Sequence, residues 1–291
     1  MKKVVFLTMD SLDGFVCYDD LLIEPLNKLG WSVEKISWRK ANVDWNKFNA
    51  VIVRSTWDYQ TDHLKFLKVL EEIDQSNAHL ENSLSILKWN MNKLYLRDLE
   101  QKEIPVPPTI WEKHFAAEES EKYFDLLNTD EIIIKPNISG NADDTFRLKR
   151  YDLKKFLPEL KYFFNNREFM VQSFMSNIID EGEYSLFNFG GQFSHAILKK
   201  PKEKDFRVQE EHGGILKSIN PSEHLLETAK TILDKIEPHP LYARIDLVRI
   251  EGNQFALMEL ELIEPSLYFN MDSESPDRFA NAFNSWIISR K

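Results

Sequence analysis

The stretch FALMELELIEPSLYF, residues 255–269, places carboxylates in an otherwise apolar run with the character of a strand. Alternate residues of a strand share a face, so Glu259 and Glu261 point the same way. The preceding run YARIDLVRI, residues 242–250, puts Arg244 and Asp246 on one face in the same manner. The sequence therefore predicts two neighbouring strands that each project charged side chains from one face.

A two-residue Gly-Asn turn at 252–253 would join these runs as an antiparallel hairpin. Counting outward from that turn sets Asp246 opposite Glu259 and Arg244 opposite Glu261. Two carboxylates directly opposite each other destabilise a sheet, unless a cation lies between them or one is protonated. Because oxygen ligands without nearby His or Cys favour hard ions, the pattern indicates Mg²⁺ or Mn²⁺.

A plainer interpretation of the same pattern stays open. Glu259 and Glu261 also fit the solvated face of an amphipathic strand, and Arg244 with Glu261 also fits a surface ion pair. Glu264 precedes Pro265, which favours a loop position rather than a place among the ligands.

Fixed cations are expected elsewhere, because Mg²⁺ held by a few carboxylates usually also binds phosphates. Lys135 ends the apolar run EIIIK, where a lysine needs a partner, and Lys93 opens a predicted helix in MNKLYLRDL. Lys199 and Arg207 flank a long polar loop at 201–214. Each also fits an ordinary charged position at a strand end, helix face or loop.

Two weaker signals concern a nucleotide. Ser139 and Gly140 form a loop after the lysine-bearing strand, which is far short of a Walker motif. The apolar run VQSFM, residues 171–175, could offer main-chain groups to an adenine edge, with Gln172 nearby. Simple core packing explains this run equally well.

The first 85 residues alternate strands and helices. Apolar runs at 4–10, 31–38 and 50–59 are separated by helical patterns, which predicts a small parallel sheet covered by helices. Ligands bind beyond the carboxyl ends of such strands. The polar residues expected there, as candidates to bind an amino-acid-like substrate, are Ser11, Asp13, Arg54, Ser55, Asp58 and Tyr59. Loops after strands are polar in any case, so this assignment and the plain one are equally supported.

The sequence after about residue 85 predicts a second part of the protein with more antiparallel strands. Strand patterns at 168–175 and 183–189 precede a Gly190-Gly191 hairpin turn, and helices are predicted at about 153–164 and 222–236. A last helix ends near Trp286. The predicted domain boundary lies near residue 85.

The bulk composition limits the classes of partner. The chain has 291 residues, 43% hydrophobic and 29% charged, with a formal net charge of -10, which argues against nucleic acid as a ligand. Cys17 is the only cysteine, so an intrachain disulfide is excluded. No apolar run approaches the ~20 residues of a membrane span, and the run after the N-terminus is too short for a signal sequence. A cytoplasmic protein without membrane contact is expected.

Taken in order, seven motifs resemble those of the ATP-grasp superfamily, over about residues 87–269. They are NKLYLRDL, IIIKPNISG, VQSFM, GEYSLF, FRVQEEHGG, RIDLV and LMELELIEP. The branch resembled is the glutathione synthetase-like and ribosomal S6 modification-like group. Within it, GEYSLF, KKPKEKDFRVQEEHGG and MELELIEPSLYF are most similar to the cyclo-ligases of cycloserine biosynthesis and their uncharacterised relatives.

The resemblance implies an ATP-grasp fold of mixed α/β and α+β class. Residues 1–85 would form a Rossmann-like parallel-sheet pre-ATP-grasp domain, and 86–291 the ATP-grasp domain. The latter would comprise a small lid-like subdomain at about 105–173 and a C-terminal subdomain at about 174–291.

The resemblance also implies a role for each matching position. The positions that match ATP-binding residues are Lys93, Lys135, Ser139, Gly140, Gln172, Phe174, Met175 and Glu183. Those that match magnesium ligands are Asp246, Glu259 and Glu261, and those near the transferred phosphate or acyl phosphate are Lys199, Arg207 and Arg244. Ser266 joins the substrate candidates.

Two positions depart from the family pattern. The small loop is NISGNADD here, with less glycine and serine than is usual. Glu261 stands where the family commonly has Asn, so it would either strengthen metal binding or pair with Arg244.

The implied function is an ATP-dependent, ADP-forming carboxylate–amine ligase that acts through an acyl phosphate on a small amino-acid-like molecule, with ring closure as one form. ATP and Mg²⁺ or Mn²⁺ would be its cofactors, loop 201–214 its lid, and a monomer or homodimer its state. Two alternatives are a non-catalytic ATP-binding regulatory protein on the same fold, and a ligase that modifies a protein or peptide terminus.

Overall fold

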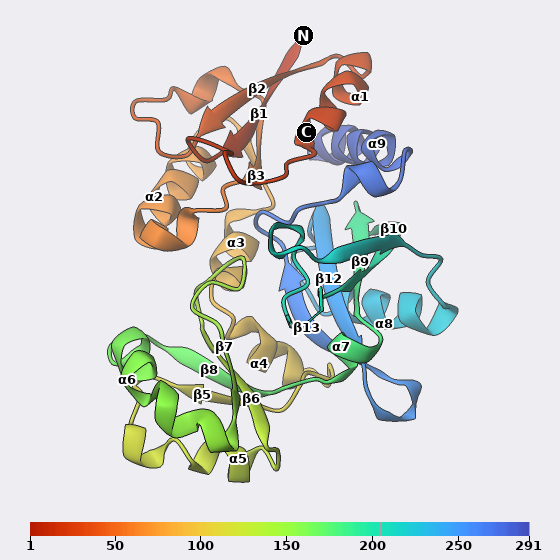
Figure 1. Ribbon diagram of the computed structural model, residues 1–291. Coiled ribbons are helices and arrows are strands. Elements are labelled where there is room, and N and C mark those ends of the chain that lie inside the picture. The colour runs from red at the N-terminus through yellow and green to blue at the C-terminus, as the bar shows by residue number, and fades with distance from the viewer. Residues whose placement is uncertain (204, 291) are drawn as a thin grey trace.

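The structure is a computed structural model and describes residues 1–203 and 205–290. Its described strands form three sheets, and the chain passes from one to the next in sequence order before returning to the first (Figure 1). The first sheet has the order β2-β1-β3-β4 and is parallel throughout, as predicted. Its strands are β1 (Lys2–Thr8), β2 (Trp31–Ser37), β3 (Ala50–Ser55) and β4 (His79–Glu81).

Helices cover both faces of this parallel sheet. Helix α2 (His63–Asp74) packs on one face through Phe66, Leu70 and Ile73. Helix α1 (Ile23–Lys28) and the C-terminal helix α9 (Ser275–Ser289) cover the other face together (Figure 1). The end of the chain therefore completes the core of its beginning. The division at residue 85 stays a prediction.

The second sheet is smaller and antiparallel, with the order β5-β8-β6-β7. Its strands are β5 (Thr109–Glu112), β6 (Glu131–Pro136), β7 (Phe146–Lys149) and β8 (Phe169–Ser173). Helices α5 (Lys122–Leu126) and α6 (Leu153–Phe164) supply the aromatic side chains that cover one face. Strand β6 alternates buried and half-buried residues, which leaves Lys135 on the uncovered face.

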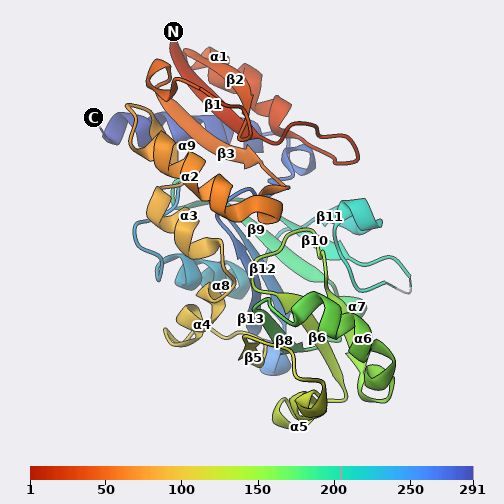
Figure 2. The same ribbon diagram turned by 90° about the vertical axis from the view of Figure 1, so that its left-hand side faces the viewer.

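The third sheet is antiparallel, with the order β11-β10-β9-β12-β13. Its strands are β9 (Glu183–Phe189), β10 (Gln192–Lys200), β11 (Ile215–Ser218), β12 (Tyr242–Arg249) and β13 (Phe255–Glu261). Helix α8 (Glu223–Leu233) packs on one face with α4 (Tyr95–Glu100). The short helices α3 (Leu84–Asn90) and α4 lead down from the parallel sheet (Figure 2), and α7 (Asn177–Asp180) precedes β9.

Two turns of this sheet test the sequence prediction. Gly190 and Gly191 join β9 to β10 as a two-residue turn, as predicted, and both have positive φ, 56° and 79°. The turn between β12 and β13 was predicted with two residues and is wider, because the last ladder pair is Arg249 with Phe255. A bulge at Met258 compensates for the extra turn residue.

The bulge restores the predicted pairing of the charged residues in β12 and β13. Asp246 lies opposite Glu259, and Arg244 lies opposite Glu261. The helix predicted to begin at Lys93 instead begins at Tyr95. Lys93 therefore lies in the turn between α3 and α4, where its backbone N–H donates to the carbonyl of Asn137 at 2.8 Å. In the part of the chain that the structure describes, no helix has the length and apolar character needed to cross a membrane.

Candidate active site

Three carboxylates converge on the hairpin of β12 and β13. Asp246, Glu259 and Glu261 each offer one oxygen, and these oxygens all lie within 4.8 Å of one another. Asp246 is only 1% exposed, and both glutamates line a cavity between the second and third sheets. The solvated-face interpretation is therefore wrong for this cluster, which is directed into the protein.

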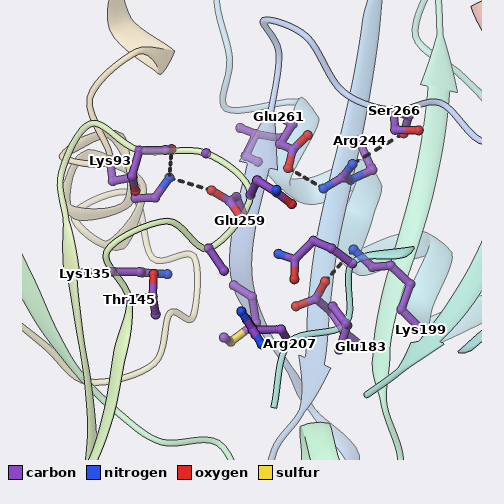
Figure 3. A pocket seen from close by; sticks show the side chains of 18 of the residues that line it. Lys93, Lys135, Thr145, Glu183, Lys199, Arg207, Arg244, Glu259, Glu261 and Ser266 are labelled. Carbon is purple, nitrogen blue, oxygen red and sulfur yellow. Dashed lines mark hydrogen bonds and ion pairs between the residues drawn. The ribbon is translucent and has the colours of Figure 1, made fainter. Parts of the chain in front are cut away.

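Cations on β12 and β10 compensate this cluster. Arg244 lies 2.9 Å from Asp246 and also pairs with Glu261, while its side chain is only 9% exposed, so this is not a surface pair. Lys199 from β10 lies 2.6 Å from Glu183 and 3.4 Å from Asp246 (Figure 3). The side-chain hydroxyl of Ser185 also donates to Asp246.

The surroundings give the three carboxyls different acidities. Burial raises the pKa of Asp246, but Arg244 and Lys199 more than offset it and hold it below its ordinary value. Burial is likewise outweighed at Glu259, where Lys93 and Lys135 lower the pKa to about 2. Burial beside the other two carboxylates raises the pKa of Glu261 to about 7 despite Arg244. A divalent cation here would favour the ionised form of all three.

The two predicted phosphate-binding lysines face this cluster from the opposite wall (Figure 3). The ammonium of Lys93 lies 2.7 Å from Glu259 and donates to the carbonyl of Ser139 at 3.0 Å. Lys135 has no carboxylate within 4 Å among the described residues, and burial lowers its pKa. It is thus a desolvated cation that projects into the cavity.

The predicted adenine-binding residues line the same cavity. The side chain of Gln172 donates to Thr109 at 3.0 Å, and the guanidinium of Arg147 lies 3.8 Å from the ring centroid of Phe174. The backbone N–H of Phe174 donates to the carbonyl of Glu131 at 3.0 Å. This amide is already used inside the sheet, so Phe174 can offer only its ring or its carbonyl. Met175, Ser139 and Gly140 complete the predicted set that lines the cavity.

The loop at 201–214 lies over the cavity. Arg207 lines it and is held by Asp205 at 2.9 Å. The loop also contacts two other parts of the protein: His212 lies 3.1 Å from the carbonyl of Asn141, and the hydroxyl of Tyr18 donates to Glu210 at 3.0 Å. These contacts place part of the loop beside the small loop of the second sheet, and its role as a lid stays a prediction.

Most of the substrate candidates from the N-terminal sheet lie elsewhere. Of that set only Tyr59 lines the cavity, as does Ser266. Arg54 is 0% exposed, lies 2.8 Å from Asp19 and donates to the carbonyl of Pro265 at 3.0 Å. Arg54 does not line the cavity, and its guanidinium instead joins the parallel sheet to the segment after β13.

The remaining candidates have local partners or face away from the cavity. Asp58 binds Arg39 at 2.8 Å and accepts from Trp38 at 2.7 Å, and Ser55 is buried in β3. The hydroxyl of Ser11 accepts from the backbone of Asp13 at 3.1 Å, and neither residue lines the cavity. These four do not support the substrate assignment.

Several cavity residues were missed by the sequence prediction. Trp57 and Gln60 line the cavity together with Glu264, which was correctly expected in a loop but was not expected in the site. The indole N–H of Trp57 donates to the carbonyl of Glu264 at 2.8 Å. Burial next to Glu261 raises the pKa of Glu264 to about 8. The sequence did contain a signal for Glu264, because the series of carboxylates continues past β13 in the motif ELIEP.

The fold matches solved ATP-grasp ligases along the whole chain. The D-alanine–D-alanine ligase of Bacillus anthracis matches with a TM-score of 0.69 at 12% identity, covering 99% of this chain and 98% of that one. A RimK domain ATP-grasp protein of Sphaerobacter thermophilus matches with a TM-score of 0.71 at 13% identity, covering 98% and 99%. The chain therefore has the ATP-grasp fold, as the resemblance of its motifs implied.

Sequence comparison identifies a more specific similarity than the fold does. Residues 4–82 match the family model of the N-terminal domain of D-cycloserine synthetase DcsG. The cycloserine biosynthesis protein DcsG of Streptomyces lavendulae is 26% identical over 298 residues, 96% of this chain and 97% of that protein. The crystal structure of D-cycloserine synthetase DcsG matches with a TM-score of 0.87 at 24% identity, covering 98% and 99%. This chain therefore shares the ATP-grasp fold with DcsG and resembles DcsG in sequence over nearly its whole length.

Proposed function

We propose that this enzyme is an ADP-forming ligase that activates the carboxylate of a small amino-acid-like molecule as an acyl phosphate and joins it to an amine. What supports the proposal most is a single cavity that places Lys93 and Lys135 across from Asp246, Glu259 and Glu261. The DcsG likeness supports a small-molecule substrate and makes intramolecular ring closure the specific form to test.

The residues present fit Mg²⁺ and a nucleotide. Three convergent carboxylate oxygens are the hard donor set that Mg²⁺ prefers, and Lys135 is a cation with no carboxylate partner among the described residues. Asp246, Glu259 and Glu261 would hold the metal, which when bound neutralises charge that develops on transferred phosphate oxygens. Lys93 and Lys135 would hold the phosphates, and Gln172, Phe174 and Met175 would surround the base.

The remaining charged residues have roles that follow from their positions. Arg244 lies beside the carboxylate cluster and near the carbonyl of Ser266, so it would stabilise the oxyanion that forms when the amine attacks. Lys199 of β10 helps to hold Asp246 in its ionised form and also pairs with Glu183 of β9. The loop at 201–214, with Arg207, would exclude water that would otherwise hydrolyse the acyl phosphate.

The test is release of ADP and phosphate with Mg²⁺ and ATP across a panel of amino acids and peptides. Asp246→Asn should lower turnover by at least ~100-fold and weaken MgATP binding while the circular dichroism spectrum is retained. The matched control is Asp234→Asn, which removes an exposed carboxylate paired only with Lys230. Unchanged turnover in Asp246→Asn would refute the metal assignment.

The same panel separates the alternatives. Good ATP binding without turnover of any amino acid or peptide would favour a non-catalytic regulatory protein. Turnover only with a folded protein or a peptide terminus would favour a modifying ligase.

A further inference from the structure

One end of the cavity is formed by residues that the nucleotide and metal assignments leave unused. They come from the loops after β1 and β3, from the turn after α3 and from the segment after β13. These residues are Phe15, Trp57, Tyr59, Gln60, Met91 and Glu264. Apart from Gln60 and Glu264, the wall they form is aromatic and apolar.

Direct contacts join the polar members of this wall. The indole N–H of Trp57 donates to the carbonyl of Glu264 at 2.8 Å, and the side-chain amide of Gln60 donates to the carbonyl of Trp57 at 2.9 Å. The rings of Phe15 and Trp57 lie 5.4 Å apart between centroids. Gln60, Trp57 and Glu264 are therefore neighbours in one surface, although more than 200 residues of sequence separate the first two from the third.

Among the described residues, the buried and half-buried carboxylates of the cavity are paired with cations except at this wall. The other buried or half-buried carboxylates each have a cation: Glu183 has Lys199, Glu259 has Lys93, and Glu261 has Arg244. No lysine, arginine or histidine of the described residues has a nitrogen within 4 Å of the Glu264 carboxylate. The wall thus holds an acid without a counter-charge.

A second acceptor in the same wall also lacks a donor. The side-chain oxygen of Gln60 is buried and has no hydrogen-bond partner among the described residues. A buried acceptor without a donor costs free energy, and a half-buried carboxylate without a cation costs more. Both costs are removed by a ligand that carries positive charge and several N–H donors.

We propose that Glu264, Gln60 and Trp57 form a subsite for the protonated amine of the substrate. The carboxylate and the amide oxygen accept its N–H groups, and the indole face adds a cation–π attraction. The proposal rests on the ligase function and takes over the role that the sequence analysis had given to Ser11, Asp13, Arg54, Ser55 and Asp58. It makes Glu264 the residue that selects amino acids over acids without an amine.

The experiment uses the full-length protein and a panel of small α-amino acids of both enantiomers, each paired with its 2-hydroxy acid. Binding without ATP is followed by the shift in melting temperature, and ADP release is measured with MgATP. The variants are Glu264→Gln and the control Glu227→Gln, an exposed carboxylate on α8.

In the wild type, at least one amino acid should bind and be turned over at least tenfold better than its hydroxy acid. Glu264→Gln should raise the KM for that amino acid at least tenfold, remove most of the preference, and change the KM for ATP less than twofold. Glu227→Gln should match the wild type.

Three results would overturn the subsite. They are an unchanged amino acid KM in Glu264→Gln, an equal loss of ATP affinity in that variant, and wild-type protein that neither binds nor turns over any amino acid better than its hydroxy acid. Amino acid binding that depends on Glu264 without any ADP release would instead support the subsite and refute the ligase function.

Discussion

Two lysines of this site, Lys199 and Lys135, have different surroundings. Lys199 lies between Glu183 and Asp246 and is 2% exposed. These carboxylates hold its pKa above the ordinary value although burial acts to lower it. Lys135 is half-buried and has no ion pair among the described residues, and desolvation lowers its pKa. The first lysine therefore stabilises the fold, and the second is suited to a ligand.

Replacing each lysine with methionine should separate these roles. Lys199→Met leaves two buried carboxylates short of a cation and should lower the free energy of unfolding by about 3 kcal/mol. Lys135→Met removes a half-buried charge that has no ion pair among the described residues, so it should change the free energy of unfolding by less than ~1 kcal/mol while weakening ATP binding at least tenfold. Urea denaturation and titration with a fluorescent ATP analogue measure both quantities.

One result would contradict the different roles assigned to the two lysines. If Lys135→Met destabilised the protein as much as Lys199→Met, Lys135 would have a structural partner, and its assignment to the phosphates would fail.

At the scale of elements, the turn between β12 and β13 tolerates an extra residue, whereas the loop at 201–214 does not tolerate a side chain at Gly214. The hairpin of β12 and β13 tolerates an extra turn residue, because the bulge at Met258 absorbs it and keeps the carboxylates aligned. The loop at 201–214 has little such freedom at its end. A Cβ on Gly214 would lie 2.0 Å from the carbonyl oxygen of Val208, so only glycine fits there.

Gly214→Ala should therefore displace the loop and lower kcat at least tenfold. The matched control is Gly191→Ala, because a side chain there meets nothing within 4 Å but is strained by a φ of 79°. That strain costs roughly 1 kcal/mol. Both variants should lose similar stability in urea, and only Gly214→Ala should lose turnover. Equal kcat in the two variants would show that the loop does not act as the lid.

At the scale of the molecule, the C-terminal helix joins the first and third sheets. Helix α9 packs Phe279 and Phe283 into the same core as Val4 and Phe6 of β1, and that core continues into β9. At its end, Arg290 lies 2.9 Å from Glu81, whose side chain is 1% exposed at the close of the parallel sheet. Burial raises the pKa of Glu81 to about 7, although Arg290 acts to lower it.

This buried acid makes global stability depend on pH. The native state binds the Glu81 proton more tightly than the unfolded chain, where the pKa is about 4.5. The stability it contributes is present below about pH 4.5 and is lost as the pH rises through about 7. Glu81→Gln should match the wild type at pH 4 and exceed it by about 1–3 kcal/mol at pH 8. Urea denaturation at both pH values measures the difference, and a gain that is the same at both would exclude this explanation.

Much of the site followed from the sequence because local periodicity specifies it. Alternation along 242–250 and 255–263 fixes which residues of a strand share a face, so the pairing of Asp246 with Glu259 could be counted from a turn. The parallel sheet and the Gly190-Gly191 turn rest on equally local signals. Lys93 and Lys135 were placed together by resemblance to a family, because no local pattern relates them.

The tertiary structure alone decided which polar residues face the cavity. Arg54 and Glu264 both follow apolar strands, and the sequence predicted that the first would bind substrate and the second would not. The packing of the parallel sheet on the segment after β13 seals Arg54 against Asp19 and leaves Glu264 in the wall of the cavity. The physical reason is that burial and counter-charge depend on segments far apart in the chain, which no spacing within one segment can report.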